Sequence, residues 1–161
     1  MAKDKDKTNV MRILDSKKIA YNVHTYDADP TLTGEQIAGI LGEDKEKVFK
    51  TLVTVAKSGE HYVFVVPVAK ELNLKKAAKA ASEKSIDMIK QKELLPLTGY
   101  VHGGCSPIGM KKQFKTFIHE TAKDFDRIYI SAGRVGAQID IDLCDLDKLV
   151  RLDYVDIIVD N

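Results

Sequence analysis

Apolar positions recur along this chain at two different periods, and the changes between them predict its helices and strands. An apolar stripe at helical spacing follows Thr8, whose hydroxyl can cap a helix. The segment Tyr21–Tyr26 alternates in the manner of a strand. A second helix is predicted from Gly34 to Leu41, opened by Thr33 and closed by Gly42.

The centre of the chain predicts a β-hairpin. Thr51–Ala56 and Tyr62–Val66 are rich in β-branched and aromatic residues, and Lys57–Glu60 joins them as a turn. Two helices follow, one capped by Asn73 and running through Ala81, the other capped by Asp87 and running through Leu94. The rest of the chain contains these predicted elements: strands Phe114–His119, Arg127–Ile130 and Ala137–Ile141, a helix Asp145–Leu149 and a last apolar stretch Val155–Val159. Because helices and strands neither alternate strictly nor segregate, the order predicts an α+β fold with a mixed sheet.

Composition narrows the class of protein. The 161 residues are expected to form one domain, 1–161, in which the charged tail 1–7 cannot be the apolar core of a signal peptide. The longest apolar run, Val63–Ala69, contains a proline and is far shorter than the roughly 20 residues of a membrane span. We therefore expect a cytoplasmic protein with no membrane partner. A net charge of +1 argues against bulk attraction to nucleic acid, so any such contact should be local.

Two glycine-rich loops are the first candidate functional segments, His102–Gly109 and Ser131–Gly136. A ligand can approach glycine backbone closely, and neighbouring N–H groups can bind an anion or an oxyanion. The first loop lacks the Gly-Lys-Ser/Thr ending of a phosphate-binding P-loop and the glycine spacing of a dinucleotide-binding fingerprint. Either loop can also be simply a turn between strands.

Lys50 is the candidate cation. Most lysines at the start of a strand are only solvated. If Phe49 and Leu52 are both buried, however, the Lys50 stem is pinned beside the sheet and its ammonium can hold an anion. A lysine fixed near glycine loops predicts a site for a polarised carbonyl or a phosphate.

Nucleophilic and metal chemistry receive little support. Cys105 follows His102 by three residues, but no third group orients such a pair, so Cys105 and Cys144 are interpreted as packing residues. The two cysteines show neither metal-ligand spacing nor a disulfide framework. No metal and no cofactor are therefore expected. Three further histidines are scattered among predicted strands and are interpreted as structural: His24, His61 and His119.

Taken in order, several segments resemble the YbaK/EbsC family, the free-standing relatives of the editing domain of bacterial prolyl-tRNA synthetases. They span nearly the whole chain: Tyr21–Tyr26, Val48–Leu52, Pro67–Ala69, Leu72–Lys76, Thr98–Gly109 and Tyr129–Gly133. Each segment is weak evidence alone, but their order and spacing make the resemblance strong. It implies a mixed sheet curled into a barrel-like core with flanking helices.

The resemblance also implies hydrolysis of a mischarged aminoacyl-tRNA, typically Cys-tRNA(Pro), after its release from the synthetase. By position, Lys50 matches the family's essential lysine, and Gly103 and Gly104 match its glycine loop. Positions that match the aminoacyl pocket are Tyr21, Thr51, Ser131 and Gln138, the last where some members carry an aspartate. The implied partners are the acceptor end of the aminoacyl-tRNA and prolyl-tRNA synthetase. A tRNA end could use one of two modest basic clusters, which are otherwise solvated faces: Lys75, Lys76 and Lys79, and Lys111, Lys112 and Lys115.

In this family the substrate's own thiol is thought to attack its carbonyl and form a thiolactone, while the enzyme supplies position and electrostatics. Cys105 stands where the family commonly has an aliphatic residue, which favours packing over nucleophilic attack. The role of Lys50 stays open between a contact to phosphate, ribose or carbonyl. Two alternatives also remain: a deacylase of Ala-tRNA or another small-residue tRNA that uses water, and a non-catalytic module that binds tRNA or aminoacyl-adenosine.

Overall fold

Two β-sheets organise the structure, a computed structural model that describes residues 7–29 and 31–160. The smaller sheet is antiparallel and has the order β1 (Tyr21–Thr25), β7 (Ala137–Asp142), β6 (Arg127–Arg134). The larger sheet has the order β4 (Ile86–Met88), β2 (Phe49–Ala56), β3 (His61–Pro67), β5 (Lys115–His119), β8 (Leu152–Val155). Because β5 runs parallel to β3 and β8 while β2 runs antiparallel to its neighbours, the larger sheet is mixed. The predicted α+β fold with a mixed sheet is confirmed.

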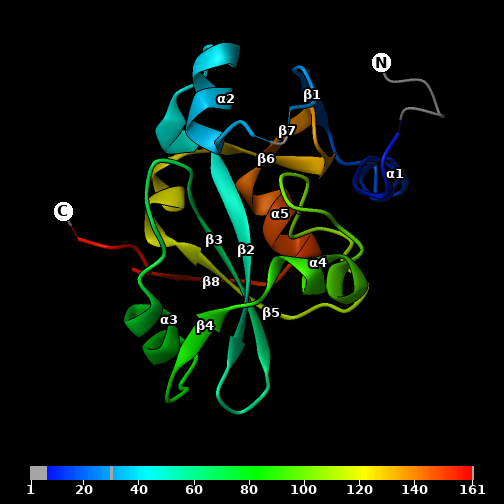
Figure 1. The fold of residues 1–161 in the computed structure, drawn as a ribbon. Coiled ribbons are helices and arrows are strands. Elements are labelled where there is room, and N and C mark those ends of the chain that lie inside the picture. Colours follow the sequence, from blue (N-terminus) through cyan, green and yellow to red (C-terminus); the bar gives the residue numbers. More distant parts are fainter. Residues whose placement is uncertain (1–6, 30, 161) are drawn as a thin grey trace.

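The two sheets are not closed into a barrel, so the expected barrel-like core is not confirmed. They are joined where Val48, just before β2, forms an isolated parallel bridge with Tyr129 of β6. Figure 1 shows α2 (Gly34–Leu41) standing over this end of β2. The candidate functional segments are brought to the same junction.

Helix boundaries are confirmed where the chain supplies caps. The Thr8 side chain caps α1 (Asn9–Ser16). A reciprocal capping box begins α2, because the Thr33 hydroxyl accepts the Gln36 N–H and the Gln36 side chain accepts the Thr33 N–H. Gly42 ends α2 at φ +68°, a left-handed conformation that glycine adopts without steric penalty.

The prediction of a helix capped by Asp87 and running through Leu94 is wrong. Asp87 lies in the short strand β4, opposite Val55, and α4 (Gln91–Thr98) begins only afterwards. Pairing with the edge of β2 buries Ile86, and this tertiary contact overrides the capping preference of Asp87.

The remaining helices agree more closely with the prediction. α3 (Leu74–Ala80) follows its Asn73 cap as predicted. α5 (Leu143–Leu149) begins earlier than the predicted Asp145, because the Asp142 side chain accepts the Cys144 N–H. Short 3₁₀ turns are η2 (Lys45–Lys47) and η3 (Glu120–Asp124).

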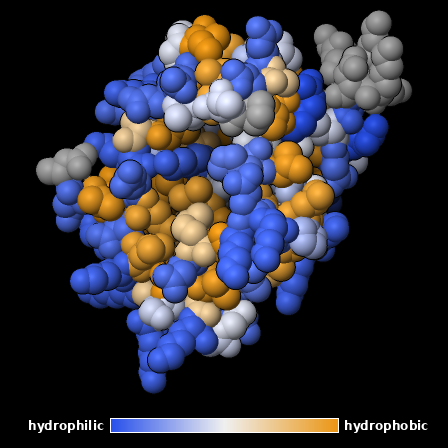
Figure 2. Space-filling model, viewed as in Figure 1, coloured by the Kyte–Doolittle hydropathy of each residue, from blue (hydrophilic) through white to orange (hydrophobic). Residues whose placement is uncertain are grey.

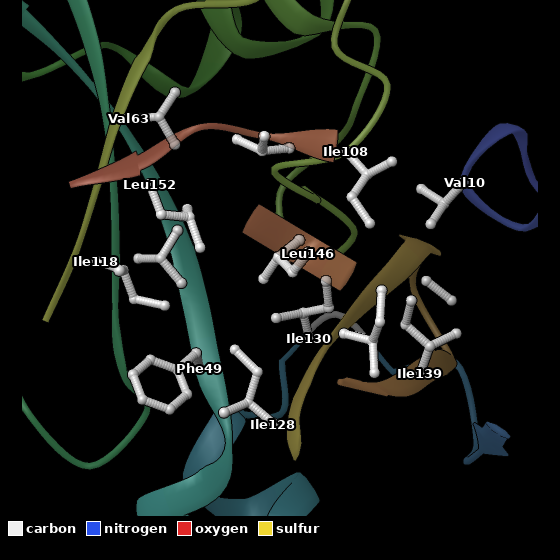
Figure 3. Close-up of a cluster of buried hydrophobic side chains, with 14 of the residues drawn as sticks. Val10, Phe49, Val63, Ile108, Ile118, Ile128, Ile130, Ile139, Leu146 and Leu152 are labelled. Carbon is white, nitrogen blue, oxygen red and sulfur yellow. The ribbon is translucent and has the colours of Figure 1, made fainter. Parts of the chain in front are cut away.

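Apolar side chains cover both faces of the larger sheet. The main core packs one face against the smaller sheet, α1 and α5. Figure 3 shows Phe49 and Ile118 of the larger sheet near Ile128 and Ile130 of β6, with Leu146 of α5 among them. A second cluster packs the other face, at Phe64 and Val66 among others, against α3.

Of the expected tail 1–7, residues 1–6 lie outside the described part of the chain, and the Lys7 ammonium pairs with Asp15 at 2.5 Å. Among the residues that the structure describes, no helix is long and apolar enough to cross a membrane.

Candidate functional site

A cavity of about 360 Å³ opens at the junction of the two sheets, beneath α2. Its apolar walls are Leu32, Ile37, Val48, Phe49, Leu52, Val68 and Leu94. Its polar lining side chains are Tyr26, Thr33, Lys50, Thr51, His102, Ser131 and Gln138. Figure 2 shows apolar side chains gathered below α2, over β2 and β3, with hydrophilic side chains around them. Such a mainly apolar cavity with a few polar groups is typical of a small-ligand site.

The short strand β4 leaves part of one edge of β2 unpaired at the cavity. β4 pairs only with Thr54–Ala56, so it does not extend along the first half of β2. On the other side of β2, the Val68 N–H donates to the Val48 carbonyl at 2.9 Å. In an antiparallel ladder the backbone N–H and C=O groups of every second residue point to the same neighbouring strand. Val48 and Lys50 therefore direct these groups toward β3, and the main chain of Thr51 faces the opposite, unpaired edge. The strand therefore presents both backbone and side-chain polar groups of Thr51 to the cavity.

Among the described residues that line this cavity, Lys50 is the one with a formal positive charge. Phe49 is buried, whereas Leu52 is only partly buried, so the predicted condition that both flanking residues are buried is met at Phe49 alone. Burial lowers the pKa of Lys50, an effect that Glu71 and Glu35 partly oppose. In the described part of the chain its ammonium has no hydrogen-bond or ion-pair partner, so it is free to bind an anionic group.

Two hydroxyl groups add hydrogen-bonding capacity. The buried Thr51 Oγ1 has no partner among the described residues, a state that costs about 1–3 kcal/mol unless a ligand satisfies it. The Ser131 Oγ accepts the Gly133 N–H at 3.1 Å, which leaves the Ser131 hydrogen available for donation. Thr51 and Ser131 therefore lie with Lys50 on the wall of the same cavity.

The two adjacent glycines of the first loop, Gly103 and Gly104, have different roles. Gly103 lines the cavity at φ +87°. Gly104 does not line it: its N–H donates to the Val101 carbonyl at 2.9 Å, and a Cβ there would lie 2.9 Å from the Arg134 backbone. The expectation that Gly104 belongs to the reacting site is corrected, because its small size serves the packing of one loop on the other.

Tyr21 does not lie in the pocket position that the resemblance implied. Its hydroxyl donates to Asp15 at 2.9 Å and its ring packs against the main core, so it does not line the cavity. Tyr26, just after β1, lines the cavity instead. The resemblance assigned the pocket position to Tyr21, at one end of the matched segment, whereas Tyr26 at the other end lines the cavity.

Gln138 connects the cavity to polar groups that sequence reasoning missed. With its amide nitrogen turned toward Glu43, Gln138 donates to both carboxylate oxygens at 2.8 and 2.9 Å. Burial raises the pKa of Glu43, an effect that neighbouring His24 partly opposes. One signal was present in the sequence: polar residues alternate along all strands of the smaller sheet, at positions such as Gln138 and Asp140.

Asp140 organises this polar face. Its carboxylate oxygens lie 2.6 Å from His24 Nε2, 2.9 Å from Asn22 Nδ2 and 2.8 Å from Arg127 Nε. Burial alone raises the pKa of Asp140, but the three hydrogen bonds outweigh it and lower the pKa below its usual value. The network fixes the strand that carries Gln138.

Cys105 lines the cavity but is poorly suited to attack. Burial raises the pKa of its thiol to about 12, so the thiol is protonated near neutral pH.

Within the described residues, no three His, Cys, Asp or Glu side chains gather into a metal site. Of the basic clusters, Lys76 is engaged in ion pairs with Asp156 and Asp160, both at 2.9 Å.

Comparisons with known proteins point to one family. Residues 28–149 match the model of the aminoacyl-tRNA editing domain. EbsC of Enterococcus faecalis, named as a proposed Cys-tRNA(Pro)/Cys-tRNA(Cys) deacylase, is 44% identical over 144 residues, which are 88% of this chain and 88% of that protein.

Two solved structures share the fold. The crystal structure of a proposed trans-editing enzyme for prolyl tRNA synthetase is 22% identical, with a TM-score of 0.82 over 94% of this chain and 95% of that one. The crystal structure of hypothetical protein APE2540 is 21% identical, with a TM-score of 0.84 over 94% of this chain and 100% of that one.

Proposed function

Because this chain belongs to the aminoacyl-tRNA editing domain family and is therefore an aminoacyl-tRNA deacylase, we propose that it hydrolyses Cys-tRNA(Pro) in trans. The choice of Cys-tRNA(Pro) as substrate is taken from the name of EbsC, to which the chain is 44% identical. The observation that carries the mechanism is the make-up of the cavity: an unpaired Lys50 ammonium and an unsatisfied Thr51 hydroxyl, without an activated nucleophile.

The substrate's thiol supplies the nucleophile. Its sulfur attacks the carbonyl carbon of the cysteinyl ester, the bond from that carbon to the ribose oxygen breaks, and the thiol proton ends on the ribose oxygen. The products are a cysteine thiolactone and deacylated tRNA, and water then opens the thiolactone to free cysteine. An ester is already activated, so the protein needs mainly to hold the thiol near the carbonyl.

The lining residues provide that position and stabilise the developing negative charge. Lys50 places a cation at the acceptor end, where it contacts a phosphate, the ribose or the carbonyl oxygen. Thr51 and Ser131 hydroxyls and the Gly103 backbone are the candidate donors to the oxyanion. Two or three such donors in a partly desolvated site contribute a few kcal/mol. Gln138, held by Glu43, forms the wall on the amino-acid side.

Prolyl-tRNA synthetase is the source of the mischarged substrate in this proposal. The chain would then act after release of the Cys-tRNA(Pro), or in contact with the synthetase.

A deacylation assay with Cys-tRNA(Pro), Ala-tRNA(Pro) and Pro-tRNA(Pro) tests the proposal. We expect multiple turnovers with the cysteinyl substrate and little with the other two, which have no thiol. Preferential hydrolysis of Ala-tRNA(Pro) would overturn thiol assistance in favour of an enzyme-positioned water. Stoichiometric binding without turnover would overturn catalysis and favour a binding module.

A further inference from the structure

A second cavity, of about 340 Å³, lies beside the first one. Val68 lines the first cavity, while its chain neighbours Pro67 and Ala69 line the second. The same holds at the start of α2, where Gly34 lines the first and Glu35 the second. Since consecutive Cα atoms are about 3.8 Å apart, the wall between the cavities is only as thick as the chain.

His119 gives the second cavity a buried donor. The side chain lines the cavity although the residue is only 4% exposed. Its Nδ1 accepts the Ile157 N–H at 3.3 Å, so the neutral ring carries its hydrogen on Nε2. In the described part of the chain nothing accepts that hydrogen, which leaves it for a ligand.

The other lining groups suit a flat heterocycle that both donates and accepts. Phe125 and Pro67 offer surfaces on which a ring can stack. Thr121 and Asp124 add a hydroxyl and a carboxylate. Cytosine presents an amino donor beside two acceptors, and a carboxylate is the usual partner of that amino group.

Two cations flank the wall between the cavities. Lys50 lines the first and Lys70 the second, and neither ammonium has an ion-pair partner among the described residues. A phosphodiester that crosses from one cavity to the other would pass between these cations. The neighbouring Lys45 is less available, since it pairs with Glu35 at 3.0 Å.

We propose that the second cavity binds the penultimate cytosine of the tRNA, while the aminoacyl-adenosine occupies the first. Every tRNA ends in the single-stranded sequence CCA, so an aminoacyl-adenosine in the Lys50 cavity necessarily brings a cytidine to its edge. The proposal rests on the function proposed above. His119 donates to a ring acceptor of the cytosine, Asp124 accepts from its amino group, and Lys70 contacts the linking phosphate.

Binding of unacylated dinucleotides tests this site without any reaction. CpA and UpA are titrated into the protein while the His119 ring resonances are followed by NMR. We expect CpA to bind about tenfold more tightly than UpA, because uracil presents an oxygen acceptor to Asp124 in place of the amino group. Adenosine 5′-monophosphate should bind without shifting His119.

The variant Asp124→Asn should abolish the preference for CpA, since an amide can donate to uracil. Asp126→Asn, an exposed neighbour outside the cavity, is the control and should keep it. Thermal unfolding checks that both variants fold. Equal affinity for CpA and UpA, or an unshifted His119, would overturn the cytosine site even if Cys-tRNA(Pro) is hydrolysed. A CpA preference without deacylation would instead overturn the proposed reaction and leave this site standing.

Discussion

Gly104 and Arg134 hold the two glycine loops in direct contact: a Cβ on Gly104 would lie 2.9 Å from the Cα and carbonyl carbon of Arg134. The two loops form one wall of the cavity through Gly103 and Ser131. The shape of the candidate site therefore depends on a packing contact outside it.

Gly104→Ala should accordingly destabilise the protein. A methyl group meets backbone that cannot rotate away, and overpacking of this kind costs about 1–3 kcal/mol. Gly39→Ala is the matched control, because its Cβ would meet nothing within 4 Å in the middle of α2. That change should stabilise by about 0.4–1 kcal/mol. Denaturant unfolding measures both, and equal stability of the two variants would contradict the loop contact.

The sequence predicted the helices with side-chain caps well, because a capping box such as Thr33 with Gln36 is a local signal. It failed at Asp87, where pairing with a distant strand edge decided the structure. It placed Lys50 and Thr51 in the site, since both follow directly from the start of one strand. It also assigned Gly104 and Tyr21 to the site, although neither lines the cavity, because their positions depend on contacts with Arg134 and Asp15.

Lys50→Ala should lower kcat/KM for Cys-tRNA(Pro) by at least about tenfold, or about 1.4 kcal/mol. Its ammonium is the formal positive charge in the cavity and has no ion-pair partner among the described residues. Lys57→Ala, an exposed lysine beyond the far end of the same strand, is the control and should keep full activity. A kcat/KM of Lys50→Ala within about twofold of that of the unmodified protein would remove Lys50 from the mechanism.

Asp140→Asn should destabilise the protein at neutral pH by about 1.5–3 kcal/mol, since hydrogen bonds to a charged carboxylate are lost. The folded state lowers the pKa of Asp140, so this stabilisation is present above the unfolded value of about 3.9 and is lost as pH falls below it. The difference between the two proteins should therefore shrink below about pH 4. Asp145→Asn, whose ion pair with Lys148 is long at 3.6 Å, should change stability by less than about 0.5 kcal/mol. A pH-independent difference for Asp140→Asn would contradict the charged network.

Cys105 should react slowly with iodoacetamide at pH 7, because burial holds its pKa near 12 and little thiolate forms. The exposed Cys144 serves as the internal reference and should be alkylated first, as mass spectrometry of the digested protein can show. Cys105→Ala should also retain most of the deacylase activity. Rapid alkylation of Cys105, or full loss of turnover in Cys105→Ser at unchanged Tm, would indicate a covalent enzyme.

The source of the nucleophile is tested by exchanging one atom of the substrate. Ser-tRNA(Pro) differs from Cys-tRNA(Pro) only in an oxygen for a sulfur, so it should fit the same cavity beside Lys50 and Thr51. It should nevertheless turn over far more slowly, because a neutral hydroxyl attacks poorly without a general base, whereas a thiol is strongly nucleophilic. Competition by Ser-tRNA(Pro) against the cysteinyl substrate separates binding from chemistry. If both substrates bind and are released with similar kcat, the attacking group is a water that the protein positions, and the thiol has no part in the reaction.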